Sequence, residues 1–142
     1  MDEFLTAMSD RPVRETMNRL ESEAHARGLT IFARVDHGFG AATAGLRLSP
    51  MQVLIVGSPR AGTPLIQANP LIGLDLPLRI LVWENETNAV IISAINPEFI
   101  AERRGITDES ARRAAHVMRI TLVQLMQSAG PATSTPRHTL GT

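Results

Sequence analysis

Residues 57–64 combine the residue types that could bind a small charged molecule. They read Gly-Ser-Pro-Arg-Ala-Gly-Thr-Pro, in which the glycines allow close backbone approach and the arginine adds charged donors. We expect the second glycine or the threonine to expose amides at a helix start, where an anion or carboxylate is held. The candidate ligand-binding residues of this segment are Gly57, Ser58, Arg60, Gly62 and Thr63. The alternative is a tight turn in which Pro64 fills the first helical position.

A second candidate is the Asp36-His37-Gly38 segment, which follows a predicted strand. Ends of strands often carry site residues, and an imidazole can transfer protons near neutral pH. His37 is therefore the candidate catalytic acid or base, and we expect it to share one small polar pocket with residues 57–63. The alternative is that Asp36 caps the following helix while His37 hydrogen-bonds a loop carbonyl.

Asp75 is an acid inside an apolar connector, between Leu74 and Leu76. Burying an unpaired carboxylate is costly, so a salt bridge to Arg60 or Arg79, or a backbone cap, is the structural interpretation. The functional alternative is a ligand contact or a catalytic acid.

Other kinds of chemistry are not indicated. The chain has no cysteine and no lysine, which removes thiol catalysis, iron–sulfur ligation, disulfides and Schiff bases. His25, His116 and His138 show no ligand spacing with each other or with His37, so no metal and no cofactor are expected. A formal net charge of zero and 4% aromatic residues argue against a nucleic-acid partner.

The chain is predicted to be a soluble, cytoplasmic protein with no membrane partner. No apolar run approaches the roughly 18 residues of a membrane span, and the acidic start lacks the basic residues of a secretory signal. Its 142 residues fit a single domain, which we place at 1–130. Residues 131–142 form a Ser/Thr/Pro tail that we expect to be disordered.

Apolar periodicity predicts the elements that must position these residues. Helical spacing predicts long helices at 12–27 and 107–129. Alternation predicts strands at 29–36, 51–57, 78–84 and 89–94, with a strand or ordered arm at 4–8. Short helices are expected at 40–44, at 64–69 and from Pro97 to Gly105. The predicted fold class is α+β, in the order β-α-β(4)-α, with an antiparallel sheet and the two long helices packed on one face.

The middle of the chain, roughly residues 12–105, resembles the bacterial and archaeal family named domain of unknown function 302. The matching residues are Asp36-His37, Ala41, Gly45, Leu46, Leu48, Pro50, Gly57, Pro59, Gly62, Thr63, Pro64, Leu65, Leu74-Asp75-Leu76-Pro77 and Asn96-Pro97. Two residues depart from the pattern, because Ser58 stands where the family usually has asparagine and Ile66 where methionine is common. The resemblance implies a fold related to the half-repeat of the TATA-binding-protein architecture, a homodimer, and no established activity.

Two function classes remain open. The first is a homodimeric module that binds a small anion or carboxylate, or regulates through such binding; a small sheet also leaves an edge strand, and edges are commonly paired or covered. Trp83, on a central strand, is expected in the core or in the dimer interface. The second is a cofactor-independent isomerase, lyase or hydrolase on a small acid, with His37 as acid/base and Arg60 holding the carboxylate. The distance between His37 and Arg60 separates these classes.

Overall fold

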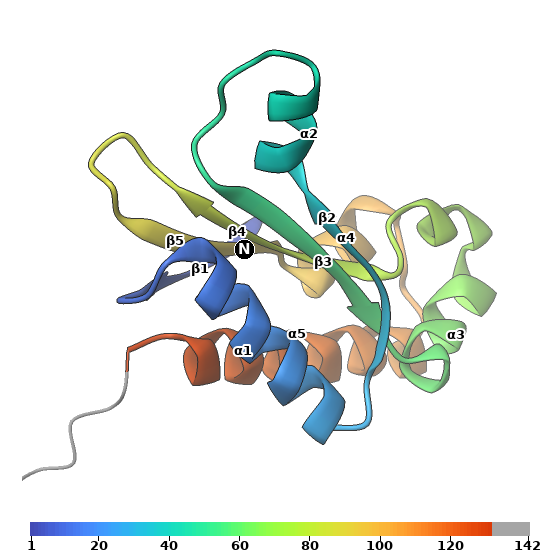
Figure 1. The fold of residues 1–142 in the computed structure, drawn as a ribbon. Helices are drawn as coiled ribbons and strands as arrows, with labels where there is room; N and C mark the ends of the chain where they lie inside the picture. Colours follow the sequence, from blue (N-terminus) through green and yellow to red (C-terminus); the bar gives the residue numbers. More distant parts are fainter. Residues whose placement is uncertain (132–142) are drawn as a thin grey trace, which may run out of the picture.

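A five-stranded antiparallel sheet is the centre of the computed structural model, which describes residues 1–131 (Figure 1). The strands lie in the order β1-β5-β4-β3-β2. Their bounds are β1 Phe4–Ser9, β2 Thr30–Asp36, β3 Met51–Gly57, β4 Leu78–Glu84 and β5 Val90–Ile95. The predicted α+β class and antiparallel sheet are confirmed, and residues 4–8 prove to lie in an edge strand. The predicted tail, from residue 132 on, lies outside the described residues.

Two long helices, α1 (Val13–Ala26) and α5 (Glu109–Ala129), lie on one face of the sheet, as their apolar stripes predict (Figure 1). The buried apolar residues of α1 are Val13, Met17, Leu20 and Ala24, and those of α5 are Ala111, Ala115, Met118, Leu122, Leu125, Met126 and Ala129. The shorter helices are α2 His37–Thr43, α3 Pro59–Ala68, the 3₁₀ turn η1 Pro70–Leu74 and α4 Pro97–Arg103.

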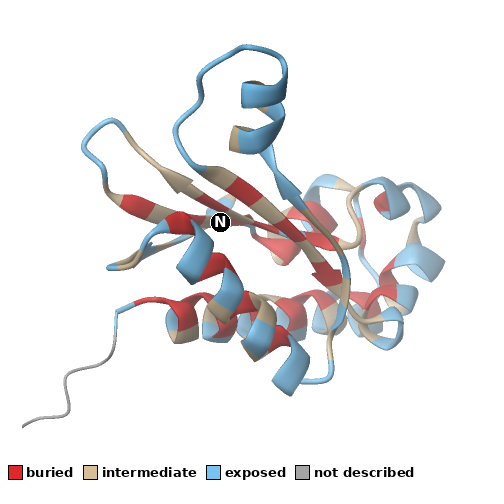
Figure 2. Ribbon diagram, viewed as in Figure 1, coloured by how far each residue is buried: buried red, intermediate tan, exposed pale blue. Residues whose placement is uncertain are grey.

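The core lies between the sheet and these two helices. Buried positions alternate with half-buried or exposed ones along β3 and most of β4, as a strand with one covered face requires (Figure 2). Leu54, Ile80, Val82 and Ile92 are fully buried on the helix side. Each such side chain contributes roughly 1.5–3 kcal/mol by leaving water, so this layer fixes which way the sheet faces.

Local hydrogen bonds set the ends of the elements. In the β4–β5 hairpin, the Asn85 side chain accepts bonds from the amides of Thr87 and Ala89 at 3.0 and 2.9 Å. Asp108 caps α5 by accepting a bond from the Ala111 amide at 2.8 Å. No helix within residues 1–131 is both long and apolar enough to span a membrane.

Among the described residues, no long helix packs on the other face of the sheet, and the outward side chains there form mostly apolar rows across the strands. One row is Met8, Ile91, Trp83 and Met51, and a second is Thr6, Ser93, Leu81, Val53 and Val35. The Trp83 ring nitrogen donates to the Ser93 hydroxyl at 3.1 Å, so Trp83 lies on this open face and outside the main core. Arg79 is the one charged side chain among the outward positions of the described strands.

Candidate ligand-binding site

The segment that follows β3 enters a helix earlier than its sequence suggests. Ser58 has an extended backbone, and Pro59 takes the first helical position, where a missing N–H costs no hydrogen bond. The predicted helix start at Pro64 is therefore wrong, because Pro64 lies inside α3. Both prolines satisfy the rule for a first helical position locally, and the earlier one begins the helix.

Because the helix starts early, the backbone amides that were predicted to bind an anion are in a different position. The amides of Ala61 and Gly62 donate to the Ser58 carbonyl at 3.0 and 2.9 Å, so they face into the helix. The Thr63 hydroxyl donates to the Pro59 carbonyl at 2.6 Å. The expected cluster of free amides at Gly62 or Thr63 is absent, while the Ser58 hydroxyl makes no capping bond to the helix.

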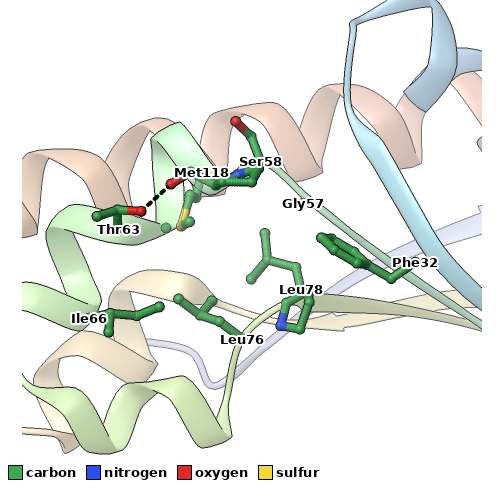
Figure 3. Close-up of a pocket in the computed structure, with 11 residues that line it drawn as sticks. Phe32, Gly57, Ser58, Thr63, Ile66, Leu76, Leu78 and Met118 are labelled. Atoms are coloured by element: carbon green, nitrogen blue, oxygen red, sulfur yellow. Dashed lines mark hydrogen bonds between the residues drawn. The ribbon is translucent and has the colours of Figure 1, made fainter.

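A cavity of about 220 Å³ opens beside this segment. Its lining residues are Phe32, Gly57, Ser58, Pro59, Gly62, Thr63, Ile66, Leu76, Pro77, Leu78 and Met118. In Figure 3, Phe32 and Ile66 lie at opposite ends of the group, with Leu76 between them and Met118 reaching in from α5. Four of the residues predicted from the sequence thus line one hollow, namely Gly57, Ser58, Gly62 and Thr63.

The two glycines keep this cavity open. A Cβ at Gly62 would lie 3.5 Å from Leu76 Cδ1 and 3.9 Å from Met118 Cε, which is ordinary van der Waals contact. A Cβ at Gly57 would lie 3.6 Å from the Pro77 Cβ and 3.8 Å from the Phe32 ring. A side chain at either position would occupy the hollow without forcing the backbone to move.

Phe32 reaches the cavity because β2 is irregular at that point. The pairing register of β2 with β3 shifts between Ile31 and Ala33, which leaves Phe32 as the extra residue. A bulge of this kind redirects a side chain, and here the ring comes to lie against Gly57.

The cavity wall is mostly carbon, with hydroxyls at Ser58 and Thr63. Exposure separates its mouth from its floor, since Phe32 and Ile66 are 52% and 40% exposed and Met118 is 5% exposed. Such a site suits a small apolar body whose polar end remains near the surface. Arg60 does not line the cavity; it is exposed at the first turn of α3.

His37 lies at the opposite end of the same strands, so the predicted shared pocket is wrong. Asp36 pairs with Gln52, whereas Thr30 pairs with Gly57. Gln52 and Gly57 are five positions apart in β3, so the two segments are about 17 Å apart along the strand. One small ligand cannot touch both.

At the His37 end of the strands, Asp36 acts as a helix cap, which was the structural alternative for this residue. Its carboxylate caps α2 by accepting a bond from the Phe39 amide at 2.8 Å, and Gln52 donates to its other oxygen at 3.3 Å. α2 begins at His37, three residues before the predicted start, because Asp36 supplies this cap. His37 is exposed, and its ring makes no hydrogen bond to any other residue in 1–131.

Asp75 forms an ion pair, but with neither predicted partner. Arg104 donates from Nε and Nη2 to the two carboxylate oxygens at 2.7 and 3.2 Å, and Arg103 Nη2 lies 3.7 Å away. Arg79 lies on the outward face of β4, and Arg60 lies on α3. The hydrogen bonds to Asp75 raise the pKa of Arg104 above its ordinary value, so this guanidinium stays charged. The Asp75–Arg104 ion pair links the end of η1 to the end of α4.

Several contributors to the cavity were not predicted from the sequence. Phe32, Leu76 and Leu78 come from other segments, and Met118 belongs to the buried apolar stripe of α5. The sequence identifies Ile66 only as a departure from the family pattern and does not predict that it lines the cavity. No group of three or more metal-ligating side chains occurs within the part of the chain that is described.

The architecture is one already seen in a solved protein. The crystal structure of an uncharacterized conserved protein DUF302 from Bacillus stearothermophilus matches with a TM-score of 0.80, over 91% of this chain and 99% of that chain. The two sequences are 19% identical, so this likeness concerns the fold. The model of the family described as Domain of unknown function DUF302 matches residues 5–128, and the chain belongs to this family.

Curated relatives are larger proteins. "Fluoride-specific ion channel FluC 1" of Brucella suis is 40% identical over 113 residues, which cover 78% of this chain and 44% of that protein. "Fluoride-specific ion channel FluC 2" of Brucella melitensis is also 40% identical over 113 residues, covering 42% of its length. The chain thus spans less than half the length of these curated relatives.

Proposed function

We propose that the protein is a regulatory module that binds a small, mostly apolar molecule with one polar or anionic end. The observation that carries this proposal is the cavity of about 220 Å³ beside the Gly57–Thr63 segment, with a carbon wall and hydroxyls near its mouth. Its volume is below the roughly 300–1,000 Å³ of sites for drug-sized ligands, so the ligand is correspondingly small.

If the polar end of the ligand is an anion, the guanidinium of Arg60 is available to pair with it. The guanidinium belongs to an exposed side chain one residue from Pro59, and no carboxylate within residues 1–131 forms an ion pair with it. A long arginine side chain can turn toward a carboxylate held at the mouth. The charge partner of the ligand is then the side chain of Arg60, and the amides of the helix start are not required.

The regulatory part of the proposal is supported by the relatives. A channel needs a part that crosses the membrane, and the fold described for residues 1–131 has no helix able to do so. The segment shared with the Brucella channels is therefore proposed to be an accessory part of those proteins. Fluoride itself is a poor match for a wall made mostly of carbon, because an anion leaving water needs hydrogen-bond donors.

The enzyme alternative receives no support from the geometry. His37 and Arg60 belong to segments at opposite ends of β3, and Asp75 already holds Arg104. No acid or base side chain lines the cavity.

Titration calorimetry with hexanoate, hexanol and sodium fluoride tests the binding function. We expect hexanoate and hexanol to bind saturably at one site per chain, and fluoride to give no heat beyond dilution. Arg60→Ala should weaken hexanoate by about twofold to fivefold, as for an exposed ion pair, and leave hexanol unchanged. Absence of saturable binding by both organic probes would refute the proposal.

We also propose that the module acts as a homodimer through the open face of the sheet. Most outward side chains of this face are apolar, and the face measures about 20 Å by 20 Å, or about 400 Å². A patch of this size, with one charged outward side chain, is typical of an interaction surface. A second copy fits because a twofold axis brings the same apolar surface of two copies together, and two sheets pack about 10 Å apart.

The segment after β2 can enlarge this interface. α2 rises from the end of β2 on the side away from α5 (Figure 1), and Phe39, Leu46 and Leu48 nearby are exposed. Their apolar area adds to that of the sheet, toward the roughly 800 Å² per partner of a standard interface.

Two exposed valines provide a matched test of the dimer. Val35 is on the open face and is 39% exposed, whereas Val117 is on α5 and is 53% exposed. By light scattering at tens of micromolar, we expect Val35→Asp to give monomers and Val117→Asp to keep the dimer. A monomeric wild-type protein at that concentration would contradict the dimer and leave the cavity proposal unaffected.

A further inference from the structure

A second, smaller hollow adjoins the candidate site. It measures about 60 Å³ and lies among α5, the end of β3 and the residue that precedes β2. Its lining residues are Leu29, Val56, Gly57, Ser58, Ala61, Leu78, Val117, Met118, Thr121, Leu122 and Leu125. We name the cavity of about 220 Å³ the outer chamber and this hollow the inner chamber.

Four residues line both chambers, namely Gly57, Ser58, Leu78 and Met118. The glycine has no side chain, the serine is short, and Leu78 is fixed on a central strand. Met118 is the long and flexible member, because methionine is unbranched and turns about three bonds. Its methyl group extends to within 3.9 Å of the Cβ position at Gly62, a lining residue of the outer chamber.

The inner chamber adjoins the outer one at the side chain of Met118, and it has one exposed lining residue of its own, Val117, which is 53% exposed. The mouth lies at the exposed side chains of Phe32 and Ile66. The inner chamber is bounded by Val56, Leu122 and Leu125, each 1% exposed, and its one additional hydroxyl, on Thr121, already donates to the Val117 carbonyl at 3.0 Å. A chain that enters at the mouth therefore meets mostly apolar side chains beyond Met118, and the hydroxyls of Ser58 and Thr121 are the polar groups of this wall.

We propose that Met118 is the residue that sets the length of the ligand, and that the ligand is an unbranched aliphatic chain with a polar head. This inference rests on the proposed function of the outer chamber. The head stays beside Thr63 at the mouth, the chain fills the outer chamber, and the thioether of Met118 closes the way to the inner chamber.

A chain-length series tests the role of Met118. Calorimetric affinities are measured for butanoate, hexanoate, octanoate and decanoate. Each further buried methylene should strengthen binding by about fourfold until the chain end reaches Met118, after which the affinity stops rising. In Met118→Ala the rise should continue for about three more methylenes, the length of the atoms removed.

Three controls accompany this variant. Met118→Leu keeps the volume of the side chain and should keep the wild-type plateau. Met126→Ala shortens a buried methionine of α5 that lines neither chamber, so it should keep the plateau as well. Adding Ala61→Leu to Met118→Ala refills the inner chamber and should restore the wild-type plateau. Met118→Val, which removes less volume, replaces the alanine variant if that variant fails to fold.

The outcomes separate this inference from the proposed function. If no acid of the series binds the wild-type protein, the proposed function fails. If the acids bind but the plateau stays at the same length in Met118→Ala and Met118→Val, the outer chamber is the whole site and the role of Met118 is refuted.

Discussion

The two ends of the β2–β3 pair have similar sequence ingredients and very different surroundings. At one end, Gly57 leads through Ser58 into α3; at the other, Asp36 leads into α2. Both have glycines, a polar residue and a helix start. The first end is enclosed by Phe32 from β2, Met118 from α5 and the 76–78 segment, whereas α2 has no buried residue. A hollow forms only where distant segments supply its walls.

The largest expected difference between the two ends is in the free energy of unfolding, measured for one variant in α3 and one in α2. Leu65 on α3 is 1% exposed, and Phe39 on α2 is 70% exposed. Leu65→Ala should lower the free energy of unfolding by about 2–5 kcal/mol, because it empties a packed position. Phe39→Ala should change it by no more than about 0.5 kcal/mol in the monomer. Urea denaturation of both variants at low protein concentration measures the difference, and equal effects would mean that α2 is packed as tightly as α3.

Binding should separate the two ends next. Gly62 and Gly40 occupy the same position in α3 and α2, the fourth residue of each helix. A methyl at Gly62 enters the cavity, whereas one at Gly40 meets nothing within 4 Å. Gly62→Ala should weaken hexanoate at least about tenfold, or about 1.4 kcal/mol. Gly40→Ala should leave the affinity unchanged.

Both glycine variants should keep or increase the free energy of unfolding, because alanine favours a helix by roughly 0.5–1 kcal/mol over glycine. The loss of binding in Gly62→Ala is thus not a loss of folding. A Gly62→Ala protein that binds hexanoate as tightly as the wild type would place the ligand elsewhere.

The smallest expected difference is in the effect on ligand affinity of replacing Ser58 at one end and His37 at the other. Ser58 has a hydroxyl at the cavity wall, so Ser58→Ala should weaken hexanol about twofold to tenfold by losing one neutral hydrogen bond. His37→Ala should have no effect on either probe, because the strand separates the two ends. The same calorimetric assay measures both, and weaker binding in His37→Ala would revive the shared pocket.

The strands and long helices could be predicted because their signals are local. Apolar alternation in β3 and β4 and the stripe of α5 each report one covered face, and the sheet follows from them. The loop residues at the cavity were found for a similar reason, since glycine and serine at a strand end are visible in the sequence.

The remaining errors have non-local causes. Pro59 and Pro64 are equally good helix starts by their sequence, and only the folded segment decides between them. Asp75 meets Arg104 across 29 positions of the chain, and Phe32 reaches the cavity through a bulge whose register depends on β3. The separation of His37 from Gly57 depends on which strand ends coincide in an antiparallel pair.

The most direct test of the account is a map of amide shifts during a hexanoate titration of the ¹⁵N-labelled protein. Glycine amides mark both ends, with Gly57 and Gly62 at the cavity and Gly38 and Gly40 in α2. We predict saturable shifts at Gly57, Ser58, Gly62 and Thr63, and none at His37, Gly38 or Gly40. Saturable shifts centred on His37, with the Gly57–Thr63 signals unmoved, would contradict it.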